Sequence, residues 1–296
     1  MKLIISGAGG LIGRQIVSEM EKTGAAITRL VRRTAIADRS EVCWRPESGD
    51  IDGPKLESHD CVIHLAGESI SGLWTKAKKE RILSSRISGT DLLVAALSAL
   101  KHPPRLLICA SASGYYGDQG SAILSEQDTA GIGFLARVCS EWESAAVRAQ
   151  EAGINVIRLR LPMILSSRGG ALAAMLPVFR LGLGGVLGSG SQYMSWCSLD
   201  EIGRIVRHCL ERLDLSGPYN AGTPTPITNK VFTQALGAFL HKRTPLPVPE
   251  FLLTLLPGDM ASEMLLASTR MHPVRLLESG YVFQHPDIAS ALRSAL

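Results

Sequence analysis

The segment KLIISGAGGLIG, residues 2–13, decides the fold of this 296-residue chain. Residues 2–6 form a short apolar run that is typical of a buried β-strand, and a helical pattern starts at Leu11. The turn between them carries glycine at positions 7, 10 and 13, in the spacing GxxGxxG. A strand, a glycine-rich turn and a helix in this order favour a dinucleotide-binding unit over an ordinary turn.

Each glycine of this turn has a physical task. Gly7 permits the tight turn out of the strand, Gly10 lets a pyrophosphate approach the backbone, and Gly13 lets the helix pack close to the sheet. The first helical residues, Leu11 and Ile12, then offer free N–H groups and the positive end of the helix dipole to the phosphates. No Gly-Lys-Ser or Gly-Lys-Thr follows, so the turn is not a Walker loop.

Strand-like runs and helical patterns alternate through the first half of the chain. Strands that are apolar throughout and separated by helices predict an α/β protein with a Rossmann-like, doubly wound parallel sheet. The predicted strands cover residues 2–6, 26–31, 60–66, 105–110 and 155–161, and the predicted helices cover residues 11–22, 78–100 and 134–151.

The rhythm changes after Pro162, where glycine-rich segments such as LGLGGVLGSGSQ (181–192) appear. Helical patterns return at 199–212 and 229–240. We therefore predict an NADP-binding Rossmann domain over residues 1–165, to which residues 192–240 partly return. A small substrate-binding or lid lobe is predicted over residues 166–191 and 241–296.

The cofactor preference follows from the end of the second strand, TRLVRRT (28–34). Proteins that bind NAD usually carry Asp or Glu here, which accepts hydrogen bonds from the ribose hydroxyls. This stretch has no acid, and Arg32 stands where the acid would be. Because a guanidinium pairs well with the 2′-phosphate of NADP, we predict NADP as the cofactor. The alternative is that these arginines form a solvated edge of the sheet.

Composition excludes several other classes of function. Lysine and arginine total 31 and aspartate and glutamate total 27, and a net charge of +4 is too small to indicate nucleic acid or membrane as a partner. No apolar run approaches the ~18 residues of a membrane span. The six cysteines are scattered, with no CxxC or HExxH motif, so we expect no metal site. Unpaired thiols and the lack of an export signal favour a cytoplasmic protein. We expect a small molecule as its substrate.

Several motifs resemble the extended short-chain dehydrogenase/reductases, the NAD(P)-dependent epimerase/dehydratase family. They are the glycine turn (7–13), DCVIHLAG (60–67), SASGYYG (111–117) and RLPMIL (160–165). Other segments resemble one atypical, poorly characterised branch that ends in a C-terminal segment of unassigned role. These are HLAGESI (64–70), FLARVCSEWE (134–143), FRLGLGG (179–185), GSGSQYMSW (188–196) and PVPEF (247–251). The resemblance covers the whole chain and implies a Rossmann domain with a small C-terminal lobe.

The resemblance also implies further cofactor contacts. Leu65, Ala66 and Gly67 are expected beside the adenosine side of the cofactor. Arg86 matches a position that contacts NADP in this branch; the alternative is an ordinary arginine on a helix surface. Residues 162–165 are expected near the nicotinamide, with a backbone contact at Ile164.

The catalytic pattern of the family is missing. Relatives use Tyr-x-x-x-Lys with a Ser or Thr, where the lysine lowers the pKa of the tyrosine so that the phenolate can act as a base. Alignment along this helix puts Leu135 at the tyrosine and Cys139 at the lysine, and Ala112 stands at the usual serine. Leu135 has no proton to move, and Cys139 cannot replace an ammonium.

Two functions therefore stay open. The first is an oxidoreductase or epimerase that uses NADP(H) on a small polar or nucleotide-linked substrate. Its candidate catalytic residues are Ser113, Tyr115 and Tyr116. The second is a non-catalytic regulator or sensor that binds NADP(H).

Overall fold

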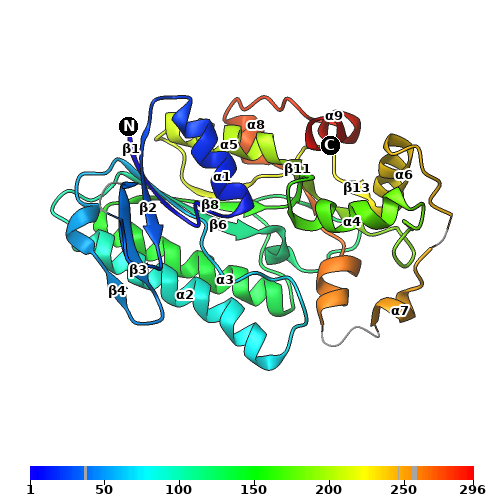
Figure 1. Cartoon of the computed structure of the whole chain (residues 1–296), viewed down its shortest axis with the longest axis horizontal. Coiled ribbons are helices and arrows are strands. Elements are labelled where there is room, and N and C mark those ends of the chain that lie inside the picture. The colour runs from blue at the N-terminus through cyan, green and yellow to red at the C-terminus, as the bar shows by residue number, and fades with distance from the viewer. Residues whose placement is uncertain (37–38, 246, 255–258) are drawn as a thin grey trace.

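An eight-stranded sheet with helices on both faces forms the centre of the molecule (Figure 1). The structure, a computed structural model, describes residues 1–36, 39–245, 247–254 and 259–296. Neighbouring strands are parallel except for the last pair, which confirms the predicted Rossmann-like sheet. Across the sheet, the strands are β12 (Gly217–Asn220), β8 (Asn155–Leu161), β6 (Leu106–Ala112), β5 (Cys61–His64), β1 (Lys2–Ser6), β2 (Ala26–Val31), β3 (Glu41–Arg45) and β4 (Asp50–Ile51).

The strand order reverses at β1, because β2 lies on one side of it and β5 on the other. In open α/β sheets, ligands bind at such a switch point, outside the carboxyl ends of the strands. The glycine turn after β1 and residues 65–67 after β5 both leave the sheet here. The fold thus places two predicted cofactor segments side by side.

Helices α1 (Leu11–Glu21) and α5 (Leu199–Glu211) cover one face of the sheet, and α2 (Lys76–Ser98) and α3 (Phe134–Val147) cover the other (Figure 1). Ile5 of β1 packs in the core under α1 and α5, and its neighbour Ile4 packs in the core under α2 and α3. Both faces of each central strand are therefore buried. This explains why the strands read as continuous apolar runs rather than as alternating patterns.

A smaller lobe follows β8 and has its own apolar core, which includes Trp196 and Phe232. Its helices are α4 (Gly170–Arg180), α6 (Asn229–Phe239) and α9 (Ile288–Ala295). Two short sheets support it: β9 (Met163–Leu165) with β11 (Trp196–Ser198), and β10 (Tyr193–Met194) with β13 (Ile227–Thr228).

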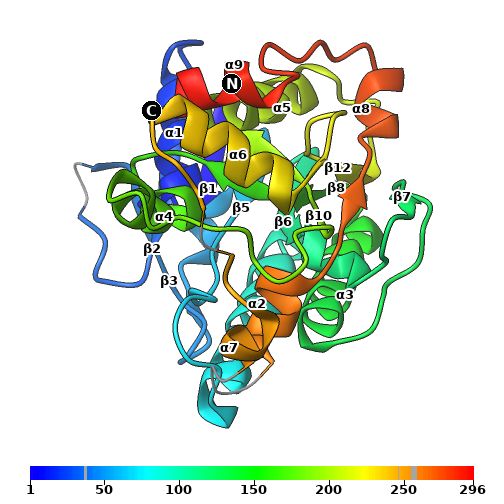
Figure 2. The same ribbon diagram turned by 90° about the vertical axis from the view of Figure 1, so that its right-hand side faces the viewer.

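The last part of the chain ties the lobe to the sheet (Figure 2). After α7 (Glu250–Thr254) and a π-helical turn (Ser262–Leu266), β14 (Arg270–Met271) pairs with β7 (Ile123–Leu124), and α8 (Val274–Glu278) leads to α9. We call residues 259–285 the C-terminal strap. Its hydrogen bonds reach, in turn, the start of α3, the loop over 113–131, β12 and α5.

Two predicted elements are shorter than expected by three residues or more. The strand predicted over 60–66 ends at His64, because the amides of Leu65 and Ala66 turn to the Ser6 hydroxyl at 3.1 and 3.2 Å. The helix predicted over 134–151 ends at Val147 and tightens into a 3₁₀ turn over 148–152.

Five of the six cysteines are buried, Cys43 is half-buried, and all are free thiols. Within the described residues, no helix is both long and apolar enough to cross a membrane. The same part of the chain holds no group of three His, Cys, Asp or Glu side chains that could bind a metal ion.

Candidate functional site

The glycine turn is packed too tightly for side chains at two positions. Gly7 has a φ of +69°, and a Cβ there would lie 3.0 Å from the carbonyl carbon of Leu65. A Cβ on Gly13 would lie 2.2 Å from the carbonyl oxygen of Gly7. These contacts show why the turn requires glycine: it brings α1 against β1 and β1 against the end of β5.

The start of α1 offers unused donors at the switch point. Its N-cap is Gly10, which has no capping side chain, and no acid occurs in the first turn. In the described part of the chain, the amides of Leu11, Ile12 and Gly13 have no backbone acceptor. A Cβ on Gly9 would meet no atom within 4 Å, so one side of the turn is open. This cradle fits the pyrophosphate of a dinucleotide.

A buried hydrogen-bond chain fixes the turn to the segment after β5. Ser6 Oγ accepts from Leu65 and Ala66, so its proton goes to Nδ1 of His64 at 2.7 Å. Nε2 of His64 then donates to Oγ1 of Thr90 at 3.1 Å, since Thr90 gives its own proton to the Arg86 carbonyl. Burial lowers the pKa of His64 to about 4, which keeps the ring neutral in this chain.

Arg86 is more than an arginine on a helix surface. Its Nη1 donates to the carbonyl oxygens of Glu68 and Ile82, both at 3.0 Å, and its guanidinium fills the space beside Gly67. Burial lowers the pKa of Arg86, and the group forms no ion pair within the described residues. Its positive charge therefore lies at the end of β5 without a described acid in ion-pair contact.

This charge also lies beside the position where the family has lysine. The guanidinium of Arg86 is 5.0 Å from the ring centroid of Trp142, one helical turn after Cys139. Burial raises the pKa of the Cys139 thiol to about 11, while the charge of Arg86 acts in the opposite direction. A cation from α2 thus approaches the face of α3 from which a lysine at 139 would rise.

Arg32 follows directly after β2 and is exposed. Its only ion pair in the described chain is a long one, 3.6 Å to Glu47. The neighbouring Arg33 differs, because its Nη2 donates to Glu41 at 2.6 Å. The Arg32 guanidinium is therefore the one that can turn to a ligand at the end of β2.

The strand predicted near the nicotinamide is β9, which contains Ile164. It pairs with β11, and the Met163 amide donates to the Ser195 carbonyl oxygen at 3.1 Å. The chain then returns to the glycine turn, since Cβ atoms at Gly169 and Gly170 would lie 3.6 Å from the Leu11 side chain. Thus β9 and the start of α4 border the same crevice as α1.

The three candidate catalytic hydroxyls lie in the 3₁₀ turn over 113–116 but differ in availability. The Tyr116 hydroxyl is buried, donates to Asn220 or Ser125 and accepts from Arg160, and burial raises its pKa to about 12. In the described chain, the hydroxyls of Ser113 and Tyr115 have no hydrogen-bond partner, and neither is buried. Of the three hydroxyls, that of Tyr116 is therefore already engaged within the protein.

The buried ion pair between Arg160 and Glu143 supports one face of the Tyr115 ring. Arg160 donates to both carboxylate oxygens of Glu143, at 2.8 and 3.1 Å, and Ser111 donates to the same carboxylate. The Arg160 guanidinium lies 3.5 Å from the Tyr115 ring centroid. These side chains on β6, β8 and α3 set the orientation of Tyr115.

The sequence alone did not reveal the contact between Glu263 and the start of α3. The carboxylate of Glu263 accepts from the amides of Phe134 and Leu135 at 2.8 and 2.7 Å. Gly133, with a φ of +122°, makes room, since a Cβ there would lie 3.1 Å from that carboxylate. The C-terminal strap thus caps the helical turn where the family has its tyrosine. The glycine before α3 was the available signal.

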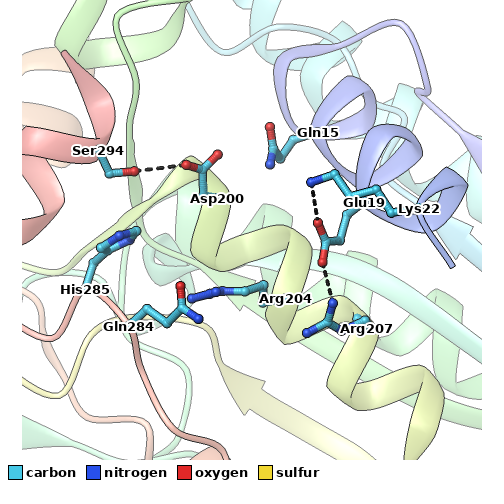
Figure 3. Close-up of a pocket in the computed structure, with 9 residues that line it drawn as sticks. All are labelled: Gln15, Glu19, Lys22, Asp200, Arg204, Arg207, Gln284, His285 and Ser294. Atoms are coloured by element: carbon cyan, nitrogen blue, oxygen red, sulfur yellow. Dashed lines mark hydrogen bonds and ion pairs between the residues drawn. The ribbon is translucent and has the colours of Figure 1, made fainter.

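Two open cavities lie elsewhere, beside α5 and the strap. The larger, of about 530 Å³, is lined by residues of α1, α5 and the chain end (Figure 3). Its cations face acids: Glu19 pairs with Lys22 at 3.0 Å and with Arg207 at 2.7 Å. Neither cavity includes a residue of the glycine turn or of the 113–116 turn.

Comparisons with known proteins agree with this geometry. The profile of the NAD dependent epimerase/dehydratase family matches residues 3–222, and residues 248–295 match a domain of unknown function. An epimerase family protein of Mycobacterium bovis is 40% identical over 289 residues, which are 97% of this chain and 95% of the relative. The crystal structure of human epimerase family protein SDR39U1 (isoform 2) with NADPH has a TM-score of 0.91 at 29% identity, covering 100% of this chain and 99% of that one. The nucleoside-diphosphate sugar epimerase from Corynebacterium glutamicum has a TM-score of 0.82 at 29% identity, covering 100% of this chain and 58% of that one.

Proposed function

Because this chain belongs to the NAD dependent epimerase/dehydratase family, we propose that it binds NADP(H) and acts as an oxidoreductase or epimerase on a small polar or nucleotide-linked molecule. The observation that carries the proposal is the open glycine turn with Arg32 beside it. The turn has free amides for a pyrophosphate, and Arg32 stands where an NAD-binding protein carries an acid. The NADPH in the human relative supports the same preference.

The residues present divide the cofactor between them. Leu11, Ile12 and Gly13 would hold the pyrophosphate, and Arg32 the 2′-phosphate. Residues 65–67 would border the adenosine side, because the Ser6–His64 chain fixes them next to the turn. The backbone of β9 at Ile164 would border the nicotinamide.

When bound, NADP(H) supplies or accepts the hydride, so the protein must place the substrate and move a proton. Ser113 and Tyr115 have the free hydroxyls for this step. We assign the proton to Tyr115, whose ring is held on Arg160, and a substrate hydrogen bond to Ser113. Arg86 supplies the positive charge that lysine supplies in the family, because its guanidinium packs against the face of α3 that carries position 139.

Affinities for NADPH and NADH, measured by calorimetry, test the cofactor assignment. We expect tighter binding of NADPH. Arg32→Ala should weaken NADPH about tenfold or more, since a hydrogen bond between charged groups contributes about 1.5–3 kcal/mol. NADH should change less than about twofold. Arg33→Ala is the matched control, because the Arg33 guanidinium is bound to Glu41. A wild-type protein that prefers NADH would overturn the assignment.

The second candidate function, a non-catalytic NADP(H) sensor, is favoured by Leu135 and Cys139 at the catalytic positions. Turnover separates the two functions. An oxidoreductase should oxidise NADPH with members of a carbonyl panel, whereas an epimerase, which returns the hydride to its substrate, should convert members of a nucleotide-sugar panel with no net oxidation of the cofactor. The double variant Ser113→Ala with Tyr115→Phe should lose either activity while still binding NADPH. Tight NADPH binding with neither activity would favour the sensor.

A further inference from the structure

Arg270 on β14 stands apart from the other sheltered arginines. Its side chain is half-buried, and its guanidinium lies 4.5 Å from the ring centroid of Tyr193 on β10. It has no ion pair and no hydrogen bond to any described residue. Every other arginine that is not exposed has one or the other within the same part of the chain. A guanidinium that is held in place but has no hydrogen-bond acceptor among the described residues can bind an acceptor on a ligand.

The donors of Arg270 also reach solvent. None of its nitrogens is among the buried polar atoms without a partner, whereas Nε and Nη2 of Arg204 are. Asp118, an acid of the loop that the strap contacts, forms no ion pair with Arg270, and its Oδ1 accepts from the amides of Ser268 and Gly120. The N–H donors of Arg270 are therefore accessible, and no described acid neutralises them.

The position of Arg270 connects it to the site described above. The adjacent Thr269 donates its hydroxyl to Gly117, directly after the candidate catalytic turn, and its amide to Tyr193. Two residues after Tyr193, Ser195 accepts from Met163 on the predicted nicotinamide strand. Figure 2 shows the orange strand β14 next to β10, between the lobe and the sheet.

We propose that Arg270, stacked on Tyr193, is the residue that recognises an oxyanion, a phosphate or a carboxylate, on the substrate. The proposal rests on the proposed function, since it assumes that the substrate lies at this border. A guanidinium pairs with such groups through two parallel hydrogen bonds, and stacking on an aromatic ring orients its plane in advance. The C-terminal strap then contributes a specificity-determining residue.

The test uses the NADPH-saturated protein and two probes, inorganic phosphate and succinate, at constant ionic strength. Binding is measured as the shift in melting temperature and in nicotinamide fluorescence. We expect saturable binding of at least one probe. Arg270→Gln should weaken it about tenfold or more, and Arg270→Lys less, because lysine keeps the charge but not the two-pronged geometry. A response to phosphate alone points to a phosphorylated substrate, and a response to succinate alone to a carboxylate.

The matched control is Arg180→Gln at the end of α4, an exposed arginine without a partner in the described chain, which should bind the probes as wild type does. All variants should bind NADPH within about twofold of wild type, which separates this proposal from the cofactor assignment. The proposal is overturned if wild type shows no saturable response to either probe, or if Arg270→Gln responds like wild type. Failure of wild type to bind NADPH would instead overturn the proposed function.

Discussion

Substitution of Gly13 by alanine tests the tight contact between α1 and β1. The new Cβ would lie 2.2 Å from the Gly7 oxygen and 2.8 and 2.9 Å from backbone atoms of Ala8. Ordinary contact begins at 3.4 Å, so the turn and the helix must separate by about 1.2 Å (3.4 − 2.2). The obstacles are backbone atoms, which cannot rotate away as a side chain could. Such overpacking costs about 1–3 kcal/mol.

Two measurements follow from that displacement. The melting temperature without cofactor should fall by roughly 2–12 °C, because each kcal/mol corresponds to about 2–4 °C in a chain of somewhat smaller size. NADPH affinity should fall about tenfold or more, since the amides of Leu11 and Ile12 no longer point at the same place. Differential scanning calorimetry and titration calorimetry give the two values.

The neighbouring Gly9 provides the control in the same turn. A Cβ there meets nothing within 4 Å, and its φ is not in the left-handed region, so Gly9→Ala should leave the melting temperature without cofactor nearly unchanged. If Gly13→Ala melts and binds NADPH like wild type, or if Gly9→Ala destabilises the free protein equally, the reasoning from close approach is wrong.

Two further predictions concern charges inside the molecule. His64 stays neutral when folded, with a pKa of about 4, whereas the unfolded chain takes up its proton near pH 6.5. Stability should therefore fall by up to about 3 kcal/mol as the pH drops from 6.5 to 4, and His64→Asn should lose this component in urea unfolding. Cys139→Lys should destabilise the protein by about 3 kcal/mol, because it buries a second cation near Arg86. The same substitution in an Arg86→Met background should recover most of that loss in a double-mutant cycle, and equal losses in both backgrounds would contradict a charge at this position.

The sequence predicted the parts of the site that depend on local chemistry. The glycine turn was recognisable because strand, turn and helix follow each other within residues 2–13, and Arg32 because it lies at a fixed distance from that turn. Tyr115 and Tyr116 could not be distinguished in this way. Both are tyrosines in one turn, and only the partners on β8 and β12 decide that one hydroxyl is engaged and the other free.

Contacts between distant segments were also beyond the sequence. Glu263 lies about 130 positions after the helix that it caps, and nothing in its own surroundings marks it. Arg86 read equally well as a surface residue, because its burial depends on how α2 packs against α3 and Trp142. The spacing of residues within one segment predicts a binding motif that lies in that segment. A site whose residues come from distant segments can be recognised only in the structure.

The C-terminal strap has a consequence for the order in which the protein can fold on the ribosome. Two buried polar side chains that are synthesised early receive some of their partners last: Glu201 accepts from the amides of Gln284 and His285, and the Asn220 side chain donates to His272. Until those residues emerge, the hydrogen bonding of Glu201 and Asn220 is incomplete, and burying them in that state is costly. The lobe and strand β12 can therefore reach their final packing only at the end of synthesis. A nascent chain arrested before residue 259 should remain sensitive to protease throughout β12 and α5.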